Sequence, residues 1–68
     1  MEGFEGLTGK LVKISWKDGQ ELKVKKGVVE GASDGFLRLR TRSNLYLIQI
    51  HSICTVKVIG QGLEWRGG

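Results

Sequence analysis

Length, composition and charge restrict this chain of 68 residues to one small domain. A chain of this size buries only about 60% of the surface that its unfolded form exposes, so its core is marginal. The single cysteine, Cys54, excludes an internal disulfide, and the sequence has no CxxC motif or His/Cys cluster typical of a structural zinc site. We expect no metal or cofactor, and we expect oligomerisation to supplement the core.

Eleven Lys and Arg residues against seven Asp and Glu residues give a net charge of +4. The excess is concentrated between Lys10 and Lys57, where ten basic and four acidic residues leave +6. A basic domain body favours polyanionic partners, nucleic acid first, and the alternative is a merely soluble surface. No apolar stretch approaches the roughly 18 residues of a membrane span, and the first residues do not resemble a secretory signal. We expect a soluble, cytoplasmic chain with no membrane partner.

Apolar and polar residues alternate with a period of two along most of the chain, and no stretch sustains helical spacing. The pattern predicts an all-β domain with five strands, at residues 11–17, 21–32, 36–41, 45–50 and 53–59. Asp18-Gly19 and Ser33-Asp34-Gly35 have the residue types of tight turns, because glycine reaches positive φ without steric cost. We expect at most a short N-terminal helical turn before the strands, and a flexible Gly-rich tail over residues 60–68.

The second expected strand is long enough to bend. We expect Leu22 and Val24 to face inward and Lys26-Gly27 to interrupt the register, because glycine within a strand marks a bulge or a sharp bend. In the third strand we expect Leu37 and Leu39 inside. Five short strands without proline, one of them strongly bent, predict a small closed SH3-like barrel over residues 7–59, although an OB-like barrel would share much of the pattern.

Two segments resemble the motifs of a known family. "LTGKLVKISWKDGQELKVKKGVVEGASDGFLRL", residues 7–39, resembles the first motif of Sm-like (LSm and Hfq) domains, and "YLIQIHSICTVKV", residues 46–58, takes the place of the second. The Arg-Gly or Lys-His pair of the second motif is absent, and Leu47-Ile48 stands where Hfq has Lys-His. The first-motif Asn that reads a base is absent after Phe36. The pattern is more similar to uncharacterised bacterial Sm-like domains, and it implies an Sm-type barrel.

The resemblance also implies a homo-oligomeric ring of about five to seven subunits, in which the fourth strand of one subunit pairs with the fifth strand of the next. A strand covered by its own barrel and by a neighbour should be apolar on both faces, as residues 45–48 are. A monomeric barrel with an apolar fourth strand is the alternative. The expected interface residues are Leu45, Tyr46, Leu47, Ile48, Val56 and Val58.

Arginines alternate along the third strand and predict a contact with nucleic acid. Arg38, Arg40 and Arg42 would project from one face about 6.6 Å apart, if the strand extends that far. Phe36 leads the same row with a ring on which a base can stack, an arrangement typical of single-strand binding. The alternative is a solvated face whose arginines pair with acids such as Glu21 and Glu30.

By resemblance to Sm-like rings, the Ser33–Gly35 turn and the His51-Ser52 turn line one face near the pore, where each subunit binds about one nucleotide of single-stranded RNA. His51 would stack on or hydrogen-bond a base, and Asp34 and Ser52 would contact base edges or ribose. The candidate nucleic-acid site is therefore Ser33, Asp34, Phe36, Arg38, Arg40, Arg42, His51 and Ser52.

Catalysis by His51 and Cys54 is not expected, since no third group orients them and Cys54 is predicted to be a small core residue. The sequence therefore favours a single Sm-like domain that forms a ring and binds single-stranded RNA without catalysis. The alternative function is an Sm-like structural or protein-interaction module without an RNA ligand.

Overall fold

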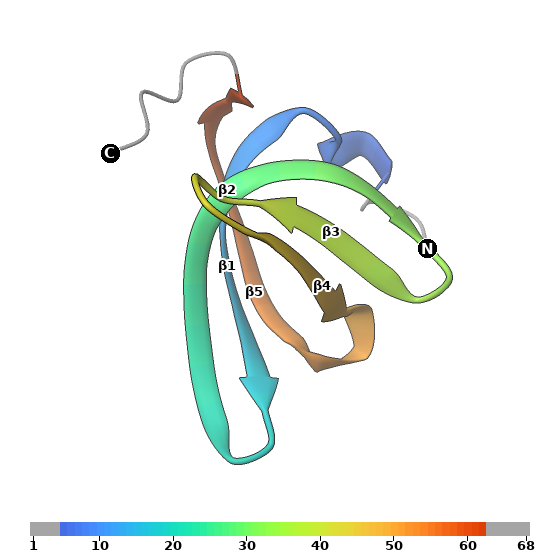
Figure 1. Ribbon diagram of the computed structural model, residues 1–68, viewed down its shortest axis with the longest axis vertical. Coiled ribbons are helices and arrows are strands. Elements are labelled where there is room, and N and C mark those ends of the chain that lie inside the picture. Colours follow the sequence, from blue (N-terminus) through green and yellow to red (C-terminus); the bar gives the residue numbers. More distant parts are fainter. Residues whose placement is uncertain (1–4, 63–68) are drawn as a thin grey trace.

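The computed structural model describes residues 5–62, and five antiparallel strands form its single sheet, in the order β4-β3-β2-β1-β5 (Figure 1). The all-β prediction, the five strands and the short N-terminal helical turn are confirmed. The elements in chain order are η1 (Glu5–Leu7), β1 (Lys10–Asp18), β2 (Glu21–Ser33), β3 (Phe36–Arg40), β4 (Leu45–Gln49), η2 (Ile50–Ser52) and β5 (Ile53–Gln61).

Strand β2 is long and strongly curved, and it pairs with a different neighbour along each half (Figure 1). Its first half pairs with β1, and its second half, from Val28 onward, pairs with β3. Gly27 keeps its register opposite Val12, so the expected interruption at this glycine is wrong. The irregularity lies between Val29 and Gly31 instead. Gly27 has another role: a Cβ there would lie 2.6 Å from the carbonyl oxygen of Arg40, so glycine lets β3 approach.

The core fills the concave side of this curved sheet. Leu37 and Leu39 are fully buried, as expected. Leu22 and Val24 are 58% and 46% exposed, so the expectation that they face inward is wrong. Directly paired residues share a face, and the hairpin register places Val24 opposite Ser15 on the outer side. The buried core cluster consists of Val12, Ile14, Trp16, Val29, Leu37, Leu39, Ile48 and Ile50.

Strands β4 and β5 are consecutive in the chain, yet they form the two opposite edges of the sheet. Only the three residues of η2 separate them, so the sheet must curl until its edges approach each other at that end. The pairings found within residues 5–62 include none between β4 and β5. Closure into a barrel of the SH3-like or Sm type therefore stays a prediction.

Strand β5 is irregular and longer than expected. Ser15 pairs with Thr55 and Trp16 with Ile53, which leaves Cys54 as an extra, exposed residue. The prediction of a core cysteine is wrong because this bulge turns the side chain outward. The strand continues to Gln61, two residues into the segment expected to be a flexible tail, most of which lies outside the described residues.

Candidate functional site

The turn between β2 and β3 has the geometry of a tight hairpin. Ser33 pairs with Phe36, so Asp34 and Gly35 alone make the reversal, with φ angles of 55° and 81°. Two positive φ angles in succession match the right-handed twist of the flanking strands, and aspartate and glycine are among the residues that tolerate them. The turn thus holds the Asp34 carboxylate at the end of the hairpin, exposed to solvent.

A backbone hydrogen bond ties η2 to this turn. The N–H of Ile50 donates to the carbonyl oxygen of Gly35 at 2.9 Å. This contact places His51, the next residue, beside the hairpin turn and creates a pocket of about 240 Å³. The residues that line the pocket are Ala32, Ser33, Asp34, Gly35, Ile50 and His51.

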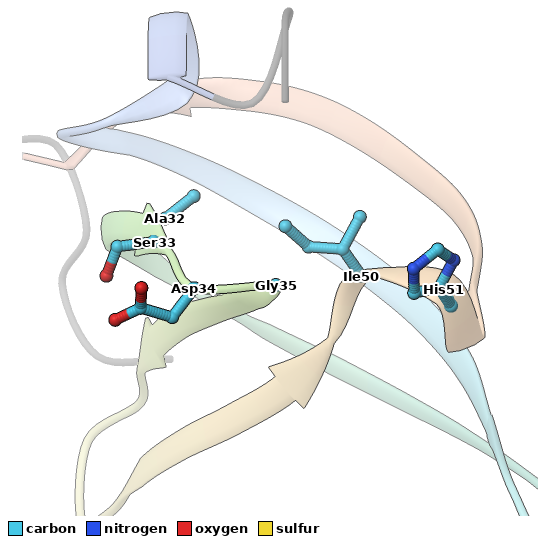
Figure 2. A pocket seen from close by; sticks show the side chains of 6 residues that line it. All are labelled: Ala32, Ser33, Asp34, Gly35, Ile50 and His51. Carbon is cyan, nitrogen blue, oxygen red and sulfur yellow. The ribbon is translucent and has the colours of Figure 1, made fainter.

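The pocket has polar ends and an apolar middle. Figure 2 shows Ser33 and Asp34 at one end and His51 at the other, with Gly35 and Ile50 between them. Ile50 is 8% exposed, whereas the three polar side chains face solvent. A carboxylate accepts hydrogen bonds, a hydroxyl donates and accepts, and an imidazole can also stack. These are groups that suit the edge and face of a planar polar ring.

Of the residues predicted from sequence, the structure brings Ser33, Asp34 and His51 into this pocket, whereas Ser52 lies outside it. Ser52 is half-buried and lines a separate hollow beside Trp16 and Gln49. Ala32 and Ile50 were not predicted, although they flank the two turns and their apolar character was a usable signal. Within residues 5–62, no group of three His, Cys, Asp or Glu side chains is placed to hold a metal ion.

The arginines of β3 have partners within the chain. Arg38 is half-buried, donates from Nη1 to Ser33 Oγ at 3.1 Å, and lies over the backbone of Gly31. Arg40 forms an ion pair with Glu30. Arg42 was expected to join the row only if the strand extended that far, and it does not, because β3 ends at Arg40 and Arg42 lies in the turn that follows. Of the three arginines, Arg38 thus lies at the edge of the pocket, through its contact with the lining residue Ser33. Phe36, which is 38% exposed, directly follows the pocket residue Gly35.

The expected interface strands expose apolar side chains. Leu45 and Leu47 of β4 are 55% and 63% exposed, and Val58 of β5 is 50% exposed. Ile59, which was not predicted, is the extra residue of a second β5 irregularity and is 40% exposed. Each edge of the sheet thus carries an apolar surface open to solvent.

The other expected interface residues are less accessible. Tyr46 and Val56 are half-buried, and the Tyr46 ring lies 6.2 Å from that of Trp16. Ile48 is 1% exposed and belongs to the core of the single chain. It is therefore a poor choice for a variant that tests an interface.

Comparisons with protein-family models, with curated proteins and with solved structures found no match to this chain. Among the described residues, no helix has the length and apolar character needed to cross a membrane.

Proposed function

We propose that this protein is an Sm-like domain that assembles into a ring and binds single-stranded RNA without catalysis. One observation carries the RNA part of the proposal: the Ile50–Gly35 hydrogen bond joins the β2–β3 turn and η2 into one pocket. The resemblance in sequence implied a nucleotide site at these two turns. The geometry of the pocket supports that inference independently of any family assignment, because it rests on a backbone hydrogen bond between the two turns and on the side chains that line the pocket.

In this proposal the pocket of each subunit takes about one nucleotide. Asp34 and Ser33 form hydrogen bonds with polar groups at the edge of the base, and His51 stacks on it or bonds to it. Phe36 provides a neighbouring ring, and each base stacked on an aromatic side chain contributes about 1–3 kcal/mol. Arg38, at the pocket edge, contacts a phosphate.

The two edges of the sheet, formed by β4 and β5, support the proposal of a ring. An unpaired edge strand with exposed apolar side chains invites pairing with another chain, and native proteins normally avoid or cover such edges. Pairing β4 of one subunit with β5 of the next would cover Leu45, Leu47 and Val58, which are exposed in the single chain. Because the two partner surfaces differ, the contact repeats head to tail and closes when the rotation permits. The family resemblance implies a ring of about five to seven subunits.

A structural or protein-interaction module without RNA is the second candidate. The Arg40–Glu30 ion pair favours it, because this pair neutralises one member of the expected arginine row. The exposed apolar side chains of β4 and β5 serve such a module equally well.

The proposal is tested by solution mass from light scattering, with and without uridine-rich or adenine-rich RNA. We expect a ring that retains RNA at low salt and releases it as salt rises. Leu47→Lys should reduce the mass to that of a monomer, because it places a charge on the edge of the sheet. Leu22→Lys is the matched control, since Leu22 is similarly exposed, at 58%, but lies in the β1–β2 hairpin and not on β4 or β5.

His51→Ala should weaken RNA binding and leave the ring mass unchanged. A wild-type ring that ignores RNA at every salt concentration would favour the structural module. A wild-type monomer, or a Leu47→Lys variant that keeps the wild-type mass, would reject the edge-to-edge assembly.

A further inference from the structure

Three lysines from three neighbouring strands form a row across the outer face of the sheet. Lys13 of β1 pairs directly with Lys26 of β2 on one side and with Lys57 of β5 on the other. All three side chains are exposed. These residues, called the lysine row below, are far apart in the sequence, so only the strand register reveals that they are adjacent.

The lysine row has no acidic partner among the residues that the structure describes. The ion pairs found there are Lys23 with Asp18, Lys23 with Glu21, and Arg40 with Glu30. The next positions along the same face are uncharged, since Ser15 pairs with Val24 and with Thr55. Like charges placed directly opposite each other destabilise a sheet. Within the part of the chain that the structure describes, these three adjacent positive charges therefore lack a compensating acid, and an external anion would relieve their repulsion.

We propose that the lysine row binds the sugar-phosphate backbone of single-stranded nucleic acid without reading its bases. Adjacent strands lie about 4.8 Å apart, so the three ammonium groups are spread over roughly 10 Å and can spread further on flexible stems. This reach matches successive phosphates of one strand. The outer face of β1, β2 and β5 carries no aromatic side chain within residues 5–62, so base stacking contributes nothing there.

A nucleic-acid backbone fits this surface better than a membrane does. Basic membrane-binding surfaces usually gather four to eight Lys or Arg residues, and Trp or Tyr side chains commonly anchor proteins at the headgroup level. The lysine row has three charges and no such anchor. Lysine is a common phosphate ligand that acts as a point charge, which suits contact without sequence preference.

This inference rests on the proposed function only in taking RNA as the nucleic acid, because the surface is separate from the pocket. The pocket lies at the β2–β3 turn and η2, whereas the lysine row crosses the middle of β1. The two sites therefore make different predictions: the lysine row controls the salt dependence of binding, and the pocket controls the preference between bases.

The test compares Lys13→Gln/Lys26→Gln/Lys57→Gln with a control of equal charge, Lys10→Gln/Lys17→Gln/Lys25→Gln. Affinity for labelled oligouridylate and oligoadenylate of about 12 nucleotides is measured between about 50 and 300 mM salt. Each phosphate contact to a single strand contributes about 0.7 to the slope of log affinity against log salt. Loss of the lysine row should therefore reduce the magnitude of this negative slope by about 2, equally for both RNAs. The control substitutions should reduce it by less than about half as much.

The outcomes separate this inference from the proposed function. Equal slopes in the two triple variants would overturn the lysine row and leave RNA binding intact. A reduced salt slope in the Lys13/Lys26/Lys57 triple variant, together with an unchanged base preference in His51→Ala, would support the lysine row and overturn the pocket. Failure of the wild-type protein to bind either RNA would overturn both. If the Lys13/Lys26/Lys57 triple variant lost binding to phosphatidylserine vesicles but kept the wild-type salt slope for RNA, the lysine row would be reassigned to a membrane surface.

Discussion

Gly27 offers the sharpest test of the packing, because its missing side chain makes room for the backbone of β3. An alanine Cβ at this position would lie 2.6 Å from the carbonyl oxygen of Arg40 and 3.1 Å from Leu39 Cγ. A backbone carbonyl cannot rotate aside as a flexible side chain can, so β3 must move away from β2. Leu37 and Leu39, which β3 contributes to the core, would move with it.

We expect Gly27→Ala to destabilise the fold by about 1–2 kcal/mol. Overpacking costs about 1–3 kcal/mol, and the reduced freedom of the unfolded chain returns about 0.4–1 kcal/mol. For a domain of this size the melting temperature should fall by about 4–16 °C. Gly6→Ala is the control, because a Cβ there meets nothing within 4 Å. Equal melting temperatures of the two variants in a calorimetric or circular dichroism scan would refute the close approach of β3.

Two further substitutions test the turn and the bulge. Asp34→Ala should lower the free energy of unfolding by about 1 kcal/mol, because alanine tolerates the φ of 55° less well than aspartate does. Asp34→Gly should not lower it, because glycine accepts this φ. Equal denaturation midpoints for the two variants would contradict the turn geometry. Cys54→Ser should change the free energy of unfolding by less than about 0.5 kcal/mol, because the side chain is exposed. The native thiol should react with a thiol reagent while the protein stays folded. Protection of the thiol in a monomer would show that the side chain is buried and would contradict the bulge.

Much of the fold could be predicted because local chemistry determines it. Period-two alternation in residues 11–17 placed Val12, Ile14 and Trp16 on one buried face, and the Asp34-Gly35 turn follows from the residue types that accept positive φ. The faces of the second strand could not be predicted in the same way. Leu22 and Val24 have apolar side chains, but the hairpin register pairs them with Lys17 and Ser15.

Pairings between distant residues explain the other differences. The bulge that exposes Cys54 depends on how β5 aligns with β1 across some forty residues of chain. The Arg40–Glu30 ion pair likewise depends on the irregularity between Val29 and Gly31. That the two turns of the pocket form one site was predicted through a family resemblance. The lysine row, in contrast, is set by strand register, which periodicity alone does not reveal.

The charges suggest why one RNA strand would need both surfaces. Ion pairs engage Asp18, Glu21 and Glu30, and Asp34 has no ion pair within the part of the chain that the structure describes. An exposed carboxylate repels phosphate but accepts hydrogen bonds from the amino and imino groups of bases. A pocket that includes Asp34 therefore suits a base and disfavours the backbone, which needs a contact beyond that of Arg38 at the pocket edge. The lysine row provides that contact, so removing the Asp34 charge with Asp34→Asn should change base preference while the salt slope stays the same.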